Sequence, residues 1–525
     1  MRSINPSDDI AKEKRRSTSR LNHRPNGKGK SARRFAIAMA AALVASSLLI
    51  ELTAEPTTHA ATNVQHSASN TSVQSNAVNT EKKLHYTAVE GAYYYTVALR
   101  SDGSVWTWGR NLWGELGVSE KVRYRHTSGP TRIPELSNVI AISAAGGGIN
   151  AAVQADGTVW EWGAGKLPSK VESIHSAKDV VTGTLTVALL QNGTVWSWQH
   201  PAAQGSDYDH LRKPHAISGL KDIIQVGTAG LHGYALKKDG SVWTWIEPDE
   251  PGKVLSKPTK IKGLTNISSI TSSDTSLLAL DKNGKVWGLD ETGKAFAFDY
   301  DFKVKKMDGN SQYMLLLTTS GEVYSYGRSV NGKEGKVNHL SGITDISAGY
   351  YHSLALSSDG TVWGWGSDKY EEAGAPATSS GGMVYKPVQA KIGTDVYLNG
   401  ELFESMYAAV ETAKTVQLPI KAIATALGAE FEIYQVKGSP NHYTLNYDNR
   451  TITIRPNETQ YVITSADSSG ERVVQIPEPI NNYSGATTVP FEVLRGLGLN
   501  VSWDSEKAML TIDDADKKDS GSLTR

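Results

Sequence analysis

The stretch Asp359-Gly360-Thr361-Val362-Trp363-Gly364-Trp365-Gly366 decides the fold, because variants of it recur along the chain. Close copies read DGSVWTWG at 102–109, DGTVWEWG at 156–163, NGTVWSWQ at 192–199 and DGSVWTWI at 239–246. Two divergent copies read NGKVWGLD at 283–290 and SGEVYSYG at 320–327. The turn glycines are Gly103, Gly157, Gly193, Gly240, Gly284, Gly321 and Gly360. A repeat of this length is typical of a propeller or a solenoid.

Each copy of the stretch predicts a β-hairpin. Asp-Gly or Asn-Gly between two apolar runs is a strong hairpin signal, and we expect a type I′ turn with both central residues at positive φ. In the strand after the turn, Trp363 and Trp365 share one face, while Val362 and Gly364 share the other. Both faces are largely apolar, as in a propeller blade packed between two neighbours. We therefore expect the repeated tryptophans to belong to the core and not to bind a ligand.

The composition limits the classes of partner. The chain has 54 Lys+Arg and 54 Asp+Glu, but residues 1–60 hold 11 basic and 5 acidic residues, which leaves 43 basic and 49 acidic residues in 61–525. A mildly acidic chain is unsuited to nucleic acid, whose phosphates attract basic surfaces. The absence of cysteine excludes disulfides, zinc–thiolate sites and cysteine nucleophiles, and it fits many secreted bacterial proteins.

Residues 1–83 predict a signal peptide and a linker. Residues 1–34 are polar and basic, 35–50 form an apolar run, and Thr58-His59-Ala60 offers a cleavage site before Ala61. Residues 1–60 are therefore expected to be a secretory signal peptide. The alternative is an uncleaved membrane anchor, for which the apolar run at 35–50 is short. Residues 61–83 are rich in Ser, Asn, Thr and Gln and predict a disordered linker.

Residues 84–393 hold the repeats and predict a seven-bladed β-propeller with four strands per blade. In the fourth unit we expect an opening strand at 213–217 and further strands at 222–226, 232–236 and 242–245. The first unit lacks such an opening strand, and 386–392 supply a spare one after the seventh. We therefore expect 386–392 to pair with the blade that contains Thr96 to Leu99, because closure of the ring removes exposed sheet edges.

Two segments carry a family resemblance. Residues 108–117, WGRNLWGELG, resemble the WGxNxxGxLG signature of regulator-of-chromosome-condensation repeats, and 348–356, AGYYHSLAL, resemble their AGxxHxLAL signature. The resemblance implies a propeller. It also implies action on a nuclear GTPase and chromatin for eukaryotic members, an activity that we do not expect of a secreted acidic chain. Secreted bacterial members of the fold bind other proteins. One of these members is an inhibitor of β-lactamases.

Residues 394–513 predict a smaller α+β domain. The segment 418–429, LPIKAIATALGA, predicts a helix that ends at a glycine, and 489–499, VPFEVLRGLGL, repeats the pattern later in the chain. The helix face expected to be buried consists of Ala422, Ile423, Ala426 and Leu427, packed on the strands around Phe431 and Ile452. The whole segment, which opens with VYLNG at 396–400, resembles the copper amine oxidase N-terminal-like or stalk domain of secreted Gram-positive proteins. That domain brings neither copper nor quinone. Residues 514–525 predict a disordered tail.

The sequence shows no motif that carries catalytic chemistry. No G-x-S-x-G, P-loop or H-E-x-x-H motif is present, so we expect no enzyme activity, no cofactor and no metal site. The first functional reading is a secreted or cell-surface binding protein, with the Gram-positive cell wall as a place of attachment and a protein or cell-wall glycan as ligand. One alternative is a hydrolase of cell-wall or environmental glycan, since paired acids from distant loops leave no linear motif. The other is a secreted enzyme inhibitor.

Aromatic residues at the two ends of the propeller predict a ligand-binding site. Blades one and seven become neighbours in a closed ring, and their loops hold six candidate residues: Tyr93, Tyr94, Trp113, Tyr350, Tyr351 and Tyr370. Tyr93, Tyr94, Tyr350 and Tyr351 lie in loops between strands of a blade, whereas Trp113 and Tyr370 are expected in loops between blades. Exposed tyrosine and tryptophan are frequent in binding hot spots. The alternative is that these tyrosines fill the blade ends as packing.

Overall fold

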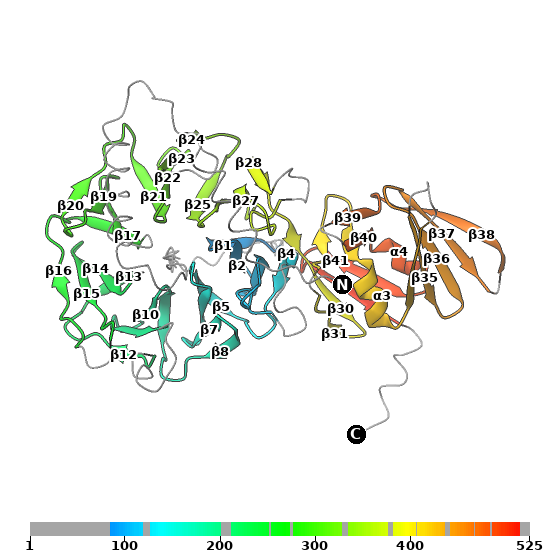
Figure 1. Cartoon of the computed structure of the whole chain (residues 1–525), viewed down its shortest axis with the longest axis horizontal. Helices are drawn as coiled ribbons and strands as arrows, with labels where there is room; N and C mark the ends of the chain where they lie inside the picture. The colour runs from blue at the N-terminus through cyan, green and yellow to red at the C-terminus, as the bar shows by residue number, and fades with distance from the viewer. Residues whose placement is uncertain are drawn as a thin grey trace, which may run out of the picture.

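The structure is a computed structural model that describes residues 84–118, 127–200, 212–250, 254–272, 277–327, 334–375, 382–405, 407–435, 441–466, 468–483 and 486–514. The predictions for residues 1–60, 61–83 and 515–525 therefore lie outside the described residues. Strands β1 to β28 form seven four-stranded sheets, which surround a common centre as the blades of a propeller (Figure 1). Strands β29 to β42 and two short helices form a second domain beside the ring. The predicted seven-bladed propeller with a smaller second domain is confirmed.

Each blade consists of four consecutive antiparallel strands. Blade one contains β1 (Tyr86–Gly91), β2 (Tyr95–Arg100), β3 (Val105–Gly109) and β4 (Thr127–Arg132). Blade two contains β5 (Val139–Ala144), β6 (Ile149–Gln154), β7 (Val159–Gly163) and β8 (Lys166–Lys170). Blade three contains β9 (Ala177–Val181), β10 (Leu185–Leu190), β11 (Val195–Gln199) and β12 (His215–Ala216). Blade four contains β13 (Ile223–Ala229), β14 (His232–Lys237), β15 (Val242–Ile246) and β16 (Thr259–Lys260).

The other three blades repeat this order. Blade five contains β17 (Ile267–Ser272), β18 (Leu277–Asp281), β19 (Val286–Leu289) and β20 (Ala295–Ala297). Blade six contains β21 (Val304–Gly309), β22 (Tyr313–Thr318), β23 (Val323–Gly327) and β24 (Gly335–Val337). Blade seven contains β25 (Ile343–Ala348), β26 (His352–Ser357), β27 (Val362–Ser367) and β28 (Met383–Gln389). The second tryptophan of the repeat is buried wherever it occurs, as predicted for a core residue: Trp108, Trp162, Trp198, Trp245 and Trp365.

The prediction of ring closure by strand exchange is wrong. Strand β28, which includes most of 386–392, is the outer strand of blade seven and pairs with β27, where Trp363 lies opposite Gln389. Blade one begins with its own inner strand β1. The expected opening strand of unit four, at 213–217, likewise contains β12, the outer strand of blade three. The predicted frame was shifted by one strand, because a cyclic repeat has the same strand order whichever strand is counted first.

Side-chain and backbone contacts across the boundary of blades one and seven, here called the seam, close the ring. The Gly91 N–H donates to Ser347 Oγ at 2.9 Å, and the Tyr350 N–H donates to the Ala92 carbonyl at 3.1 Å. Farther out, Trp108 Nε1 donates to the Glu372 carbonyl at 3.2 Å. The seam therefore joins separate sheets without sharing a strand.

The hairpin turns differ from the predicted type I′. At the first of them, Gly103 has φ +78° and donates its N–H to the Arg100 carbonyl at 2.9 Å, but Asp102 is not at positive φ. A single left-handed glycine that closes the turn is typical of a type I turn with a bulge. Asp102 Oδ1 instead accepts the N–H of Ser104 at 3.0 Å, so the aspartate stabilises the turn through its side chain.

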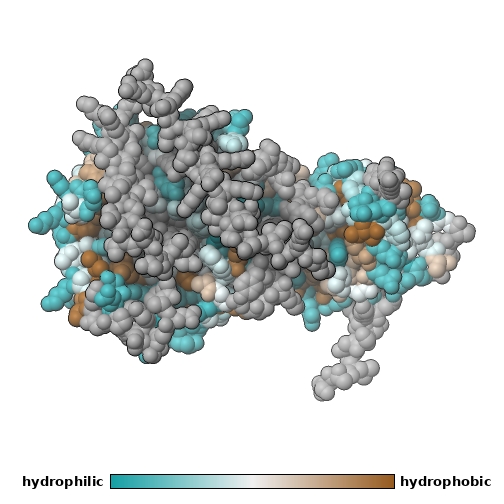
Figure 2. All heavy atoms as spheres, in the orientation of Figure 1, coloured by the Kyte–Doolittle hydropathy of each residue, from teal (hydrophilic) through white to brown (hydrophobic). Residues whose placement is uncertain are grey.

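The second domain has three sheets around one core. Its elements are β29 (Ile392–Gly393), β30 (Asp395–Leu398), β31 (Glu401–Leu402), β32 (Val410–Glu411), β33 (Val416–Pro419), α3 (Ile420–Leu427), β34 (Glu430–Tyr434), β35 (His442–Tyr447), β36 (Arg450–Ile454), β37 (Gln460–Ser465), β38 (Ser468–Gln475), β39 (Asn481–Tyr483), β40 (Ala486–Pro490), α4 (Glu492–Arg495), β41 (Asn500–Asp504) and β42 (Met509–Asp513). The two sequence copies meet where β33 pairs with β40 in antiparallel register. The described surface of this domain mixes hydrophilic and hydrophobic residues (Figure 2). Among the described residues, no helix is long and apolar enough to span a membrane.

The buried face of helix α3 differs in part from the prediction. Ile423 and Leu427 are buried as expected, in the core that contains Ile452, with Phe431 packed against it. Ala422 is half-buried and Ala426 is exposed, because the inward face consists of Ile420, Ile423, Ala424 and Leu427. This spacing is the usual apolar stripe of a helix. Gly428 ends the helix in the left-handed conformation, with φ +79°.

Candidate functional site

The six predicted binding residues lie together at the seam, and we call them the aromatic cluster. The rings of Tyr94 and Tyr351 are stacked, with centroids 4.4 Å apart and an interplanar angle of 22°. The Tyr93 ring lies 5.1 Å from Tyr350 and 5.3 Å from Tyr351. The Tyr370 ring meets Tyr94 edge-on at 5.5 Å. Four tyrosines from blade seven and blade one, with Tyr370 beside them, thus form one continuous group across the seam.

Arg110 connects Trp113 to the tyrosines. Its guanidinium carbon lies 4.9 Å from the centre of the Trp113 ring and 4.8 Å from that of Tyr93. The residue is only 6% exposed, and its Nε donates to Glu115 Oε1 at 2.9 Å. A buried arginine between aromatic faces gains cation–π energy and holds the rings in place. Sequence reasoning did not identify Arg110, although its position in the repeat signature was visible.

The aromatic cluster is half-buried. Tyr93, Tyr94, Tyr350, Tyr351 and Tyr370 have intermediate exposure, whereas Trp113 is 41% exposed. Burial is the largest cause that raises the pKa of Tyr94, and it raises the pKa of Tyr351 in the same way. Both hydroxyls therefore remain protonated over the physiological range and can donate hydrogen bonds. The aromatic cluster therefore offers a ligand aromatic faces, hydroxyl donors and one exposed indole, while its tyrosines also pack against one another.

The loops that supply Trp113 and Tyr370 lie within blades and not between them, as a consequence of the shifted frame. The first follows β3 in blade one, and the second follows β27 in blade seven. The two loops, WGRNLWGELG at 108–117 and WGSDKYEEAG at 365–374, are structural copies. Asn111 Oδ1 accepts the N–H of Leu116 and Asp368 Oδ1 accepts that of Ala373, at 3.0 Å in each case.

A second shared contact fixes the aromatic residue of each loop. The backbone N–H of Trp113 donates to Glu115 Oε2, and that of Tyr370 donates to Glu372 Oε2, at 2.7 Å in each case. Because the side chain of a buried glutamate holds the loop tip, each aromatic residue has a fixed backbone position. Aligning 365–374 with 108–117 would have identified the second loop from the sequence.

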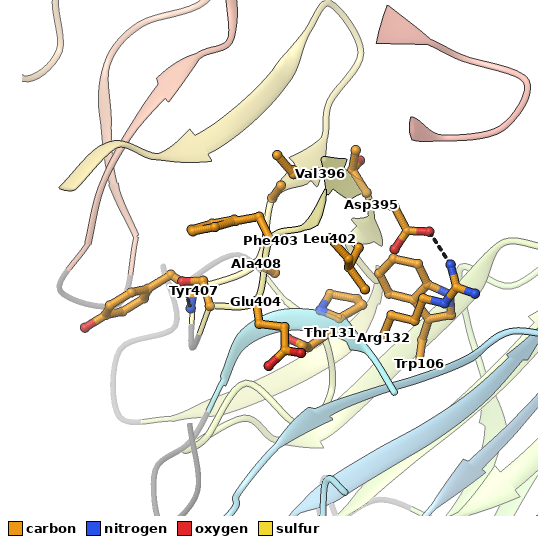
Figure 3. A pocket seen from close by; sticks show the side chains of 14 residues that line it. Trp106, Thr131, Arg132, Asp395, Val396, Leu402, Phe403, Glu404, Tyr407 and Ala408 are labelled. Carbon is orange, nitrogen blue, oxygen red and sulfur yellow. Dashed lines mark hydrogen bonds and ion pairs between the residues drawn. The ribbon is translucent and has the colours of Figure 1, made fainter. Parts of the chain in front are cut away.

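A small pocket lies where the second domain contacts blade one (Figure 3). Its cavity volume is about 40 Å³, and its walls include Trp106 and Arg132 of the propeller and Asp395 and Phe403 of the second domain. Arg132 Nη1 and Asp395 Oδ2 form an ion pair at 2.8 Å. Burial raises the pKa of Asp395, and Arg132 opposes that shift. Because the Arg132–Asp395 ion pair joins the two domains at its wall, we interpret the pocket as part of the domain contact.

Gly393→Ala should separate the two domains. A Cβ atom at Gly393 would lie 2.3 Å from Trp106 Cζ3 and 2.8 Å from the Pro130 carbonyl oxygen. Trp106 is buried, so the second domain must shift, at a cost of about 1–3 kcal/mol for overpacking. We expect small-angle scattering to show a wider distribution of interdomain distances. The control is Gly470→Ala, where nothing lies within 4 Å of the added atom. An unchanged scattering profile for Gly393→Ala would contradict the tight contact.

The described residues contain no group of three His, Asp or Glu side chains arranged to hold a metal ion. The propeller is a ring of repeats, and its first and last repeats place matching loops at the seam. A small β-rich domain lies next to the ring. This defines the class as a repeat propeller with an appended module.

Family models identify both parts. Regulator of chromosome condensation (RCC1) repeats match residues 102–153 and 343–371, which include Trp113 and Tyr370 of the two copied loops, here called the seam loops. The copper amine oxidase N-terminal domain matches residues 397–512. The chain therefore contains RCC1 repeats and a copper amine oxidase N-terminal domain, and both resemblances are confirmed.

The curated relatives share parts of the chain. Protein pim1 of Schizosaccharomyces pombe is 25% identical over 301 residues, which cover 53% of this chain and 46% of pim1. The human E3 ubiquitin-protein ligase HERC2 is 28% identical over 181 residues, which cover 30% of this chain and 4% of HERC2. The chain thus spans less than half the length of either relative. Among solved structures, human WBSCR16 is 14% identical with a TM-score of 0.45, covering 56% of this chain and 94% of WBSCR16.

Proposed function

We propose that the chain is a secreted or cell-surface binding protein without catalytic activity, and that the aromatic cluster at the seam is its ligand-binding surface. The ligand is a protein or a cell-wall glycan. The copper amine oxidase N-terminal domain presents the propeller at the Gram-positive surface. The predicted signal peptide at 1–60 supports secretion. The excess of acidic residues in 61–525 disfavours nucleic acid as a partner.

One observation carries the proposal: six aromatic residues from four separate loops converge on one place, with Trp113 41% exposed. Trp and Tyr are enriched in hot spots because they bury a large area with few rotatable bonds, and sugars stack on the same faces. The packing alternative accounts for the stacked pair Tyr94 and Tyr351. It does not account for the indole of Trp113, which is held by Arg110 at the surface.

The double variant Tyr94→Ala, Tyr351→Ala should lose ligand binding. We expect affinity to fall at least about 30-fold, which corresponds to about 2 kcal/mol for a hot-spot pair. The measurement compares wild type and variant in two assays: capture of secreted and cell-envelope proteins from a Gram-positive culture, followed by affinity titration of the captured protein, and binding to a glycan array. Turnover of any array glycan would favour the hydrolase alternative, and inhibition of a captured enzyme would favour the inhibitor.

Two further variants separate binding from packing. Tyr324→Ala, Tyr326→Ala removes two half-buried tyrosines from strand β23 of blade six, which does not border the seam, and is the matched control. Trp113→Ala removes the exposed indole and leaves the stacked rings of Tyr94 and Tyr351 in place. Binding that survives in both the double variant and Trp113→Ala would place the site elsewhere. A double variant that melts far below the blade-six control, while Trp113→Ala binds normally, would support packing alone.

A further inference from the structure

The two seam loops share their backbone contacts but differ in charge. In blade one, the buried Glu115 pairs with Arg110. In blade seven, the corresponding Glu372 is also buried, but Ser367 occupies the position of Arg110 and donates its hydroxyl to Glu372 Oε1 at 2.5 Å. The ion pair of blade one is thus replaced by a neutral hydrogen bond.

Two other positions add carboxyl groups to the blade-seven loop. Asp368 replaces Asn111, and Glu371 replaces Gly114 and keeps the left-handed backbone, with φ +64°. Asp368 and Glu371 are each 6% exposed. Lys391, just after β28, donates to Glu371 Oε2 at 2.6 Å. The loop therefore buries three carboxyl groups beside one lysine.

Two of these carboxyl groups, those of Asp368 and Glu371, each have one oxygen without a hydrogen-bond partner in the described part of the chain, but the other oxygen of Glu371 is paired with Lys391. Asp368 Oδ2 is buried and has no hydrogen-bond partner among the described residues. A buried carboxylate oxygen without a partner is costly, and protonation of the group lowers that cost. Burial, with the negative charges of Glu372 and Glu371 next, raises the pKa of Asp368 to about 8. In its neutral form Asp368 has the shape of the asparagine that blade one uses at this position.

The loop is in direct contact with both the seam and the aromatic cluster. The Glu372 carbonyl accepts hydrogen bonds from Thr96 Oγ1 at 2.8 Å and from Trp108 Nε1 at 3.2 Å, both in blade one. Glu372 Oε2 holds the backbone of Tyr370, whose ring meets Tyr94. A change in the charge of this loop therefore acts on the position of Tyr370 and on the closure of the ring.

We propose that the blade-seven loop, residues 366–374, is a pH-sensitive element that holds Tyr370 against Tyr94 while Asp368 is neutral and loosens when Asp368 ionises. The groups that face Asp368 are Glu371 and Glu372 of its own loop and Lys391 after β28. On the blade-one side, the loop meets Thr96 and Trp108, which carry no charge, and Tyr94, which stays protonated. A single lysine cannot balance three ionised carboxyl groups.

The direction of the pH effect follows from proton linkage. The folded state keeps the Asp368 proton up to about pH 8, whereas the unfolded chain loses it near pH 3.8. Between these values the folded state binds more protons, so this residue makes the propeller less stable as pH rises. The consequence for ligand affinity, weaker binding at alkaline pH, rests on the proposed function, but the loop itself can be measured without a ligand.

The test compares the full chain with the variant Asp368→Asn at pH 6 and pH 9. Asparagine stays neutral, so the unfolding equilibrium constant of wild type relative to the variant should rise by about 10- to 100-fold between the two values. Hydrogen exchange, corrected for intrinsic rates, should show loss of protection in 366–374 at pH 9 in wild type and not in the variant. The blade-one loop, 109–117, is the internal control, because Asn111 and the Arg110–Glu115 pair hold it at both pH values.

The outcomes separate the inference from the proposed function. Equal loss of protection in both loops at pH 9, or a wild type and variant that change in parallel, would overturn the pH-sensitive loop and leave the binding surface untouched. A pH-sensitive loop in a protein that still binds normally both as the double variant Tyr94→Ala, Tyr351→Ala and as Trp113→Ala would retain the inference and reject the binding surface. Asp368→Ala provides a second variant if Asp368→Asn folds poorly.

Discussion

Leu427→Asp is expected to unfold the second domain and to leave the propeller folded. Leu427 is 3% exposed in the core that also contains Ile423 and Ile452. A carboxylate placed there has no partner, and burying it costs several kcal/mol, comparable to the whole stability of a small domain. Calorimetry or urea unfolding of the full chain should lose one transition and keep the other, since separate cores unfold separately.

The control for this experiment lies one residue earlier. Ala426 is exposed on the same helix, so Ala426→Asp should cost about 1 kcal/mol or less, mainly through lower helix propensity. The pair of variants also tests the register of α3, because the sequence pattern had placed Ala426 on the buried face. A single transition lost as a whole in Leu427→Asp would show that the two domains unfold as one unit.

Trp108→Ala should weaken the seam more than any other part of the ring. Trp108 is fully buried, packs with Leu354, Leu356 and Val362 of blade seven, and donates to the Glu372 carbonyl. Removing a buried tryptophan costs about 3–5 kcal/mol. We expect a lower urea midpoint for the propeller, together with faster hydrogen exchange on both sides of the seam, in β1 and β26.

A matched tryptophan distinguishes the seam from packing in general. Trp162 is equally buried, and its Nε1 donates to the Glu115 carbonyl at 3.1 Å, so it joins blade two to blade one as Trp108 joins blade one to blade seven. Trp162→Ala should cost a similar free energy and leave exchange at β26 unchanged. Equal protection at β26 in the two variants would mean that the seam has no separate weakness.

The sequence alone predicted the blades because their pattern is local. A turn glycine precedes the third strand of every blade, and two alternating tryptophans follow it in five of the seven blades, so periodicity alone identified the repeat. The outer strands carry far less information: β12 and β16 are very short, and their hydrogen-bond partners decide the blade to which they belong. Local patterns cannot assign a short strand to one of two adjacent sheets, which explains the shifted frame and the wrong prediction for 386–392.

The sequence predicted the aromatic residues of the candidate site but not its charged residues. Tyr93, Tyr94, Tyr350 and Tyr351 could be brought together on paper because they occupy equal positions in the first and last repeats, and ring closure makes these repeats neighbours. The charged groups beneath them were missed. Whether Arg110, Asp368 or Glu371 is buried depends on packing across the seam, and a charged residue in a loop is normally solvated. Only the alignment of the two loops with each other contains a signal for them.

Closure without a shared strand determines the order in which the chain can complete its fold. Gly91 and Ser347, which hydrogen-bond across the seam, are separated by 256 residues. Contacts of such long sequence separation carry the largest loop-closure entropy and form after local hairpins. During synthesis, the tyrosines of blade one can therefore pack against those of blade seven only after blade seven has been made. The aromatic surface exists only in a molecule whose ring is complete, so a truncated or half-folded chain lacks it.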